Sequence, residues 1–288
     1  MAKKILKETL KETLKEIVTV PNEIKQYLVG HDVFSAMMNL SGKVFRDVRG
    51  RKTMQLTLGE KSYFIKQHFG VGWAEIIKNL LSFKKPILGA ITEVNAIKKL
   101  DEIGIATTPL VAYGVSGCNP AIQQSFILTD DLGDIVSLED LCLSWQSSPP
   151  DVKFKRRLII AVAKLARKLH ESGVNHRDFY LCHLCLDAQL LKRGKIKLYL
   201  IDLHRMLIHR SASQQHSMKD IAALYFSSMD VALTPRDYLR FKHYYGQGFS
   251  ICTTHFWQQV ETRALKLYAK FHSDKFQKRL ADEKRLVD

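Results

Sequence analysis

Two short motifs constrain the fold of this chain more than any other feature: His176-Arg177-Asp178 and Ile201-Asp202-Leu203. A segment with helical periodicity runs into the first motif, and a strand-turn-strand pattern separates it from the second. Loops at the ends of adjacent strands can lie a few ångströms apart. The sequence therefore predicts that the carboxylates of Asp178 and Asp202 share one site.

This order of motifs is typical of the catalytic loop and the metal-binding loop of kinases. Phosphoryl transfer needs one carboxylate beside the attacking hydroxyl and another on the Mg²⁺ that bridges the phosphates of ATP. Asp178 is therefore the predicted catalytic residue, and Asp202 is the predicted metal ligand. Asp202 is followed by Leu203-His204, where kinases usually have Phe-Gly. The alternative for each carboxylate is a loop Asp that only forms a turn or a cap.

Two further residues of this region are candidates for the site. His183 follows Asp178 by five positions, where a typical kinase has an Asn that binds the second metal ion. We predict His183 as a metal or nucleotide ligand, although it could also hydrogen-bond a phosphate or simply pack. Asp220 opens a helix predicted over Asp220–Ser227, where it anchors the backbone of the catalytic loop, caps the helix, or does both.

The segment before these motifs has the pattern of a β-hairpin that ends in a lysine. Alternating apolar residues precede a turn at Gly59-Glu60, and the second strand carries Lys66. An ammonium at this position can neutralise phosphates of ATP while it pairs with a carboxylate. Glu93, on the second of two predicted helices, is the expected partner, and Glu75 on the first helix is the competing one.

These patterns predict an α+β, two-lobed fold with a small β-rich N-lobe, a larger helical C-lobe and a cleft at their junction. The predicted boundaries are residues 1–30 for a helical extension, 31–132 for the N-lobe and 133–288 for the C-lobe. The clearest helix runs from Asp151 to Ser172 because its apolar residues recur at helical spacing. A short hairpin is expected around Arg193-Gly194, with Leu190-Leu191 in its first strand.

The overall charge favours anionic partners. The chain has 288 residues and a formal net charge of +15, which attracts nucleic acid, anionic lipid or phosphorylated and carboxylated substrates. The five cysteines are odd in number and unevenly spaced, so a reducing compartment is expected. No apolar run reaches the roughly 18 residues of a membrane span. A basic surface with apolar helices could also dock an acidic carrier protein.

Three features leave alternatives open. No Gly-rich loop is visible in the sequence. The basic residues around Gly50 either hold phosphates or form a solvated face. These residues are Arg46, Arg49, Arg51 and Lys52. The repeat in Lys3–Ile17 predicts a solvated helix or, less simply, a helix at a membrane interface. Cys182-His183-Leu184-Cys185 suggests zinc, but a structural site needs four ligands and no second close pair is evident.

Several stretches together resemble the lipopolysaccharide core heptose(I) kinase family. The resemblance covers most of the chain from about Gly42 to Tyr245 and is weak in residues 1–30 and in the last forty or so. The stretches that carry it are Lys61-Ser-Tyr-Phe-Ile-Lys66, Glu75-Ile-Ile-Lys-Asn-Leu-Leu81, Pro86-Ile-Leu-Gly-Ala90, Asn175-His-Arg-Asp-Phe-Tyr-Leu-Cys-His-Leu184, Ile201-Asp-Leu-His-Arg205 and Lys219-Asp-Ile-Ala-Ala-Leu-Tyr-Phe-Ser-Ser-Met229.

The resemblance implies a protein-kinase-like fold and ATP-dependent phosphorylation of the first heptose of the lipopolysaccharide inner core, at the 4-hydroxyl in the best-known members. It implies that Asp178 is the acid–base residue, that Asp202 binds the metal and that Lys66, paired with Glu93, binds phosphate. His183 stands where this family also has His.

The expected partners are the lipopolysaccharide inner-core acceptor and an anionic inner-leaflet surface, with no nucleic acid. The protein would then be cytoplasmic, on the cytoplasmic face of the inner membrane. The alternatives are a kinase for another hydroxyl acceptor, such as Kdo, an aminoglycoside or a protein, or a non-catalytic kinase-fold module that binds anionic lipid.

Overall fold

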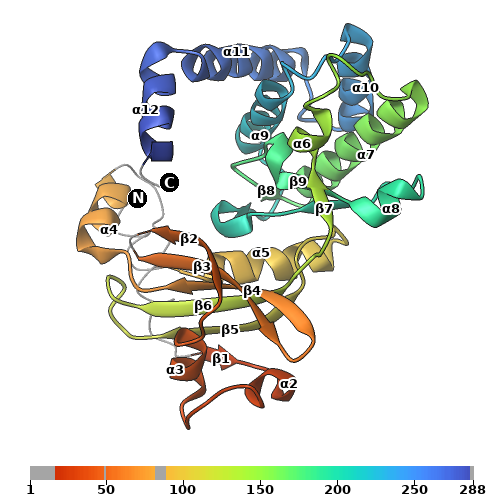
Figure 1. The fold of residues 1–288 in the computed structure, drawn as a ribbon. Coiled ribbons are helices and arrows are strands. Elements are labelled where there is room, and N and C mark those ends of the chain that lie inside the picture. The colour runs from red at the N-terminus through yellow and green to blue at the C-terminus, as the bar shows by residue number, and fades with distance from the viewer. Residues whose placement is uncertain (1–16, 49, 82–88, 286–288) are drawn as a thin grey trace. The chain divides into compact units, whose positions relative to one another are not determined.

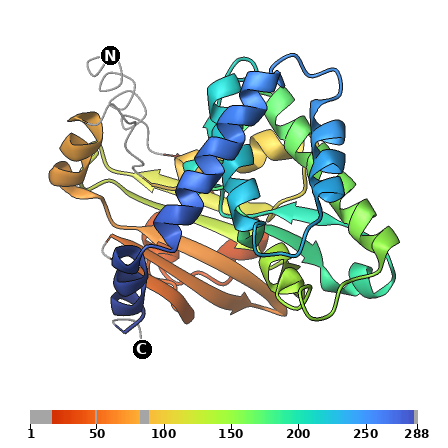
Figure 2. The same cartoon turned by 90° about the horizontal axis from the view of Figure 1, so that it is seen from above.

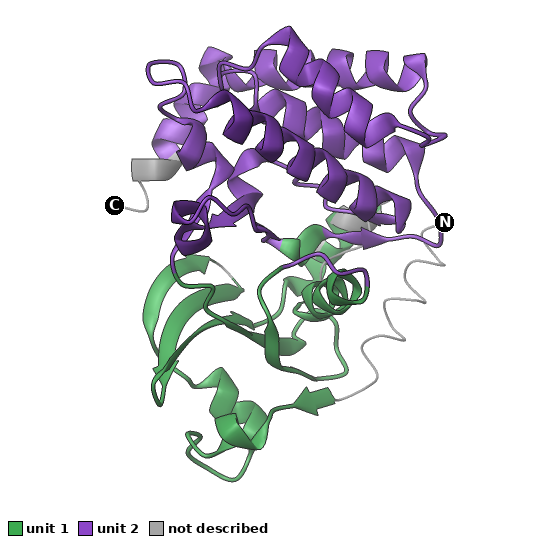
Figure 3. Cartoon of the chain, turned by 90° about the vertical axis from the view of Figure 1, so that its right-hand side faces the viewer, with its two compact units in different colours: residues 1–102, 107–133, 203–205 green, residues 103–106, 134–202, 206–288 purple. Residues whose placement is uncertain are grey.

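The computed structural model describes residues 17–48, 50–81 and 89–285. The chain divides into two compact units (Figure 3). Unit 1 comprises Met1–Glu102, Thr107–Gly133 and Leu203–Arg205, and unit 2 comprises Ile103–Ala106, Asp134–Asp202 and Met206–Asp288. Among the described residues, unit 1 holds the large sheet and unit 2 holds most of the long helices. The predicted separation into a β-rich part and a helical part is therefore present.

The sheet of unit 1 has six strands in the order β1-β5-β6-β4-β3-β2, and all of its neighbouring pairs are antiparallel (Figure 1). The predicted hairpin forms β3 and β4, and Gly59 adopts a φ of 63° in its turn, which glycine tolerates. The strands are β1 (Ile17–Thr19), β2 (Lys43–Val48), β3 (Arg51–Leu58), β4 (Lys61–His68), β5 (Leu110–Ser116) and β6 (Gln124–Asp130).

Alternation along these strands gives the sheet two different faces. One face is apolar, and its side chains pack with α3 (Val33–Met38) in a core that includes Phe34, Met54, Ile65 and Phe126. Because successive residues of a strand point to opposite faces, Lys66 is on the other face. The remaining helices of unit 1 are α2 (Asn22–Lys25), α4 (Gly72–Leu81), α5 (Ile91–Glu102) and the short η2 (Leu203–Arg205).

Unit 2 is built on helices, among which α7 packs against α10 and α9 against α11 (Figure 2). Its helices are α6 (Leu138–Cys142), α7 (Val152–Glu171), η1 (Leu181–His183), α8 (Ala188–Lys192), α9 (Gln214–Ser227), α10 (Pro235–Gly246), α11 (Thr254–Phe271) and α12 (Asp274–Arg285). Its short strands are β7 (Ile135–Ser137), β8 (Val174–Asn175), β9 (Leu184–Asp187), β10 (Leu198–Leu200) and β11 (Leu207–Ile208).

The clearest predicted helix is confirmed as α7. Its N-terminus is capped by Asp151, whose carboxylate accepts a hydrogen bond from the backbone N–H of Phe154 at 2.8 Å. The chain leaves the helix at Gly173, which has a φ of 73° and where a Cβ would lie 2.5 Å from the carbonyl oxygen of His209. No other residue fits there without strain, so the sequence ends this helix where predicted.

The hairpin expected around Arg193-Gly194 is wrong in its first strand. Leu190-Leu191 lies in the short helix α8, and β10 pairs instead with β9. The reason is local, because Asp187 accepts a hydrogen bond from the N–H of Leu190 at 2.8 Å and starts a helical turn.

Two predictions concern residues outside the described part of the chain. The helix predicted over Lys3–Ile17 falls on residues 1–16, and only Ile17 is described, as the first residue of β1. Arg49, one of the basic residues around Gly50, is also outside the described residues. None of the helices in the described ranges is both long and apolar enough to cross a bilayer.

Candidate active site

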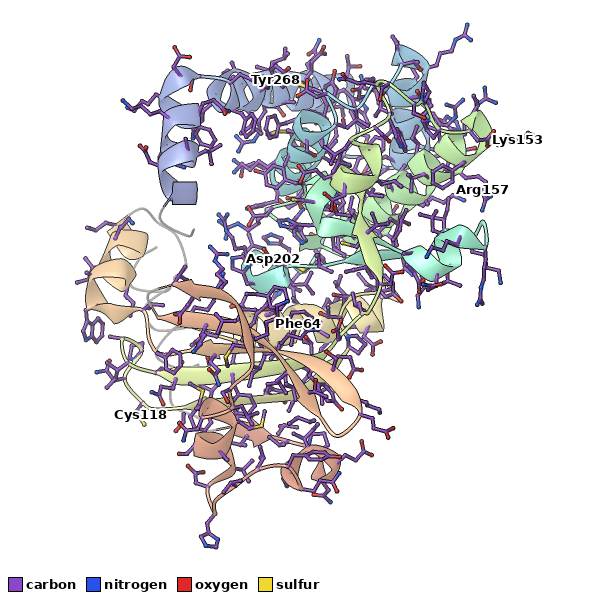
Figure 4. The ribbon with its side chains drawn as sticks, in the orientation of Figure 1. Phe64, Cys118, Lys153, Arg157, Asp202 and Tyr268 are labelled. Carbon is purple, nitrogen blue, oxygen red and sulfur yellow. The ribbon has the colours of Figure 1, made fainter. Side chains whose placement is uncertain are left out.

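The candidate residues fall in both units: Asp178, His183 and Asp202 in unit 2, and Lys66 and Glu93 in unit 1. In unit 2, α7 is followed closely by the short strand β8, and His176–Asp178 forms the loop after β8. Arg177 has a φ of 72° in this loop, and Asp202 has a φ of 60° just after β10 (Figure 4). Left-handed backbone at a residue with a side chain costs about 1–3 kcal/mol and persists only where the surroundings enforce it. Both predicted carboxylate loops are therefore held in strained conformations.

Asp220 enforces the conformation of the first loop. Its two carboxylate oxygens accept hydrogen bonds from the backbone N–H of His176 at 2.7 Å and of Arg177 at 2.8 Å. These contacts confirm that Asp220 anchors the backbone of the loop that carries Asp178. The predicted position of Asp220 at a helix start is wrong, because α9 begins at Gln214 with Ser213 as its N-cap. Asp220 therefore projects from the interior of a long helix, which fixes it more firmly than a terminal turn would.

Asp220 is almost completely buried, with 1% of its surface exposed. Burial alone would raise its pKa. The hydrogen bond and charge interaction with His170, together with the bonds from the loop backbone, outweigh this effect and hold the pKa of Asp220 below its ordinary value. The carboxylate therefore stays ionised and forms charge-assisted hydrogen bonds, which are stronger than neutral ones.

A buried chain of hydrogen bonds supports Asp220 from behind. His170 Nε2 lies 3.2 Å from Asp220 Oδ2, and His170 Nδ1 lies 2.7 Å from the hydroxyl oxygen of Tyr245. A carboxylate can only accept, so Nε2–H of His170 donates to Asp220. Burial raises the pKa of Tyr245 well above its ordinary value, which keeps its hydroxyl protonated beside Nδ1.

His183 contacts the backbone of Asp178 and lies near the carboxylate of Asp202. Its Nδ1 lies 2.7 Å from the carbonyl oxygen of Asp178, so Nδ1–H donates this bond. Its Nε2 lies 3.6 Å from Asp202 Oδ2. Nε2 of His183 and the carboxylate of Asp202 therefore lie side by side, and the role of His183 as a metal ligand stays a prediction.

His176 joins the two loops through their backbones. Its Nε2 lies 2.9 Å from the carbonyl oxygen of Ile201, the residue before Asp202, and therefore donates to it. Its Nδ1 is buried and has no hydrogen-bond partner among the described residues. Burial lowers the pKa of His176, so the ring is neutral and has this one tautomer. The backbone N–H of Ile201 also donates to the carbonyl of His183 at 3.0 Å. The strand end that carries Asp202 is thus fixed to the loop that carries Asp178.

In unit 1, the predicted lysine–glutamate pair is present. Lys66 Nζ, on β4, lies 2.6 Å from Glu93 Oε1, on α5. The sequence had left Glu75 as a competing partner, and the ion pair forms with Glu93. Glu93 is 4% exposed, and its second oxygen, Oε2, has no hydrogen-bond partner among the described residues. A buried carboxylate with only one partner holds the ammonium firmly in place.

The predicted metal ligands of unit 2 are two in number, Asp202 and His183. In the described part of the chain, no cluster of three or more His, Cys, Asp or Glu side chains could hold a metal ion without other ligands. Mg²⁺ in nucleotide sites needs fewer, because phosphate oxygens and waters complete its shell. Asp202 Oδ2 and His183 Nε2 would supply two ligands.

An apolar cavity of about 560 Å³ lies elsewhere in unit 2. Side chains from α6, α7, α9, α10 and α11 line it, among them Leu138, Leu158, Leu224, Phe241 and Trp257. Sequence reasoning missed this feature because its lining residues have the same helical periodicity as core residues. A cavity of this size and lining is suited to an apolar ligand.

In the β-rich unit a strand lysine, Lys66, pairs with a helix glutamate, Glu93. In the helical unit the buried carboxylate of Asp220 anchors the loop that carries Asp178. These two features define a protein-kinase-like fold. The comparisons with known proteins agree. The model of the lipopolysaccharide kinase (Kdo/WaaP) family matches residues 35–245, and the chain belongs to this family.

The chain is similar to curated members of the family from two organisms. It is 45% identical to lipopolysaccharide core heptose(I) kinase WaaP of Escherichia coli (strain K12) over 219 residues, which are 75% of this chain and 83% of that protein. The WaaP of Pseudomonas aeruginosa PAO1 is also 45% identical, over 217 residues that cover 75% of this chain and 81% of that protein. A solved structure described as WaaP in complex with acyl carrier protein has a TM-score of 0.74 at 36% identity, and the match covers 88% of this chain and 99% of that one. These matches confirm the predicted family and the predicted kinase-like fold.

Proposed function

We propose that this protein is an ATP-dependent kinase that phosphorylates the first heptose of the lipopolysaccharide inner core. The observation that carries this proposal is the 45% identity, over three quarters of the chain, to proteins named as heptose(I) kinases. The loops around Asp178 and Asp202 are consistent with it, because their strained backbones are held by buried hydrogen bonds.

The proposed chemistry assigns one role to each residue. The sugar hydroxyl attacks the γ-phosphorus of ATP, the bond from that phosphorus to the bridging oxygen breaks, and ADP leaves. Asp178 orients the hydroxyl and accepts its proton. Lys66, held by Glu93, neutralises charge on the phosphates. Mg²⁺, for which Asp202 and His183 are the proposed ligands, would supply charge neutralisation at the phosphates.

The acceptor hydroxyl is the finer part of the proposal. We assign the 4-hydroxyl of the first heptose.

The test is incubation of the purified protein with Mg²⁺, labelled ATP and core lipopolysaccharide that lacks heptose phosphate, followed by mass analysis of the sugars. Parallel reactions contain a Kdo-terminated acceptor, an aminoglycoside or a protein substrate. Label on heptose supports the proposal. Label on another acceptor alone, or no transfer to any acceptor, would overturn it.

An acidic carrier protein is the proposed protein partner. The net charge of +15 attracts an acidic surface, and a related WaaP has been solved with acyl carrier protein. The apolar cavity of unit 2 could then receive the acyl chain that such a carrier presents. Binding should therefore be tighter for the acyl-loaded carrier than for the unacylated carrier. Val162→Phe, which narrows the cavity, should weaken only the acyl-dependent part, whereas Val152→Phe at the exposed start of the same helix should not. Equal binding of both carriers would refute the role of the cavity.

Peripheral attachment to the anionic inner leaflet is the proposed location. Trp73, Ile77 and Leu81 recur at helical spacing on α4 and are 48%, 51% and 76% exposed, whereas Ile76 is buried. An exposed apolar stripe with Trp, flanked by exposed Lys78, is typical of a helix that lies in a membrane interface.

Vesicle co-sedimentation tests this location. We expect binding to vesicles that contain anionic phosphatidylglycerol and little binding to neutral phosphatidylcholine vesicles. The double variant Trp73→Ser/Ile77→Ser should lose most of the binding. Leu143→Ser, at a residue that is 76% exposed in unit 2, is the matched control and should bind normally. Equal binding by both variants would contradict the role of α4.

A further inference from the structure

The face of the sheet that carries Lys66 also carries a histidine and an arginine. His68 follows Lys66 by two positions on β4, so both side chains are on the same face, where Phe64 also stands (Figure 4). Arg51 of β3 pairs directly with His68 in the strand register. This places its side chain on that face as well, next to the imidazole. The backbone holds the end of the hairpin together, because the N–H of Phe69 donates to the carbonyl of Gly50 at 2.9 Å.

His68 is buried in this position with an unused polar atom. It is 7% exposed, and its Nε2 is inaccessible to water and has no hydrogen-bond partner among the described residues. On its other side β6 places Ser125 opposite His68, and Ser125 Oγ accepts from the N–H of Ala90 at 3.0 Å. A Cβ at Gly89 would lie 2.2 Å from Ser125 Oγ and 3.9 Å from the Cβ of His68. The backbone before α5 therefore packs closely beside the imidazole.

A buried nitrogen without a partner costs free energy in the absence of a ligand. In a core position this cost would favour an apolar side chain. The presence of His68 here points to a partner for Nε2 outside the described residues.

The charges around His68 define what that partner is. Burial, together with the positive charges of Arg51, Lys66 and His204, lowers the pKa of His68 to about 3. The imidazole is therefore neutral and can donate one hydrogen bond without adding a further charge. Glu93 is the carboxylate paired with Lys66. The cluster formed by Arg51, Lys66 and His68, which we call the β4 cationic cluster, is complementary to an anion with several oxygen acceptors.

We infer that the β4 cationic cluster binds the phosphate groups of the nucleotide, with Nε2–H of His68 donating to a phosphate oxygen and Arg51 neutralising charge beside it. This inference rests on the proposed kinase function and adds two phosphate-binding residues to Lys66. It also explains how a chain without a Gly-rich loop holds phosphates. Of the basic residues around Gly50, Arg51 belongs to this site. Lys52 lies 3.9 Å from Asp47 and pairs with Gln67 in the strand register, so its side chain is on the opposite face.

The test measures binding of ATP, ADP, adenosine and tripolyphosphate by calorimetry in Mg²⁺ buffer. His68→Phe keeps a ring of similar size and removes the donor, and Arg51→Met keeps a long side chain and removes the charge. We expect each to weaken ATP and tripolyphosphate by about tenfold and to leave adenosine unchanged. Lys61→Met, at an exposed residue of the same strand, is the control. Thermal denaturation verifies that each variant is folded.

The outcomes separate this inference from the function on which it rests. Unchanged ATP affinity in both His68→Phe and Arg51→Met, with wild-type protein that binds and uses ATP, would overturn the inference alone. Wild-type protein that binds no ATP would overturn the proposed function. A further arm adds micelles of phosphorylated lipid A. Weaker lipid binding by the two variants, with intact ATP binding, would assign the cluster to lipid phosphate and would also overturn the inference.

Discussion

Asp220→Asn tests most directly whether Asp220 anchors the loop that carries Asp178. It keeps the size and shape of the side chain and replaces one carboxylate oxygen with an NH₂ group. Oδ1 accepts from the N–H of Arg177 at 2.8 Å, and Oδ2 accepts from the N–H of His176 at 2.7 Å and from His170 at 3.2 Å. An amide has only one acceptor oxygen. Whichever way it turns, its NH₂ group must face at least one donor.

The expected loss of stability follows from these contacts. If the amide oxygen stays with His176 and His170, the backbone N–H of Arg177 loses its partner. An unsatisfied buried donor costs about 1–3 kcal/mol, and the remaining bonds lose their charge assistance. We therefore expect the free energy of unfolding to fall by about 2–4 kcal/mol. Arg177 has a φ of 72°, so a loop without this bond should relax and displace Asp178. A displacement on the order of 1 Å lowers the rate by about 100-fold.

Urea denaturation and initial rates of phosphate transfer measure the two effects. The decrease should appear in kcat, with little change in the KM for ATP, because Asp220 contacts the loop and not the nucleotide. Asp230→Asn is the matched control, since the Asp230 side chain is 63% exposed. If Asp220→Asn retains at least half of the wild-type kcat and loses less than about 0.5 kcal/mol, the anchoring argument is refuted.

Three further changes have definite expected results. Tyr245→Phe removes the hydroxyl that lies 2.7 Å from His170 Nδ1. In urea denaturation the free energy of unfolding should fall by about 1–2 kcal/mol, and kcat should fall several-fold. An unchanged kcat would show that the hydroxyl does not position the loop. Lys66→Met should lower kcat/KM for ATP on the order of 100-fold, and initial rates that stay near wild type would contradict its role. The pKa of His68 is about 3, and burial lowers that of His176 below the ordinary 6.5. The unfolded chain therefore binds more protons below pH 6.5. The free energy of unfolding should fall between pH 6 and pH 4 by about 1.4 kcal/mol per pH unit on account of His68, and His176 should add to the decrease in the same direction. Urea titrations of His68→Phe should show a slope that is smaller by this amount, and an identical slope would argue against a neutral buried His68.

The elements that the sequence predicts well are those whose local pattern and packing agree. Apolar residues at helical spacing between a capping Asp151 and Gly173 specify α7, since cap, stripe and stop all indicate the same helix. The order of motifs predicts an ion pair for Lys66 and leaves two partners open, Glu93 and Glu75; the structure shows the pair with Glu93.

The errors and omissions have physical causes. The start of α9 was placed too late because its first turns carry few apolar residues, and Ser213, its actual cap, did not stand before an apolar stripe. The contact of His170 with Tyr245 joins residues 75 positions apart, and no local pattern specifies such a pair. The apolar cavity could not be predicted from the sequence either. Periodicity identifies which helix faces are buried, and it does not say whether those faces leave a space between them.

Phosphate transfer by Asp178→Asn gives the most direct test of the proposed chemistry. The amide has nearly the same shape as the carboxylate and cannot accept the hydroxyl proton. With Mg²⁺, ATP and core lipopolysaccharide that lacks heptose phosphate, wild-type protein should yield phosphorylated heptose. The variant should bind ATP with unchanged affinity and yield about 1,000-fold less product or lower. Turnover by the variant within tenfold of wild type would contradict the assignment of Asp178 and, with it, the mechanism proposed for this chain.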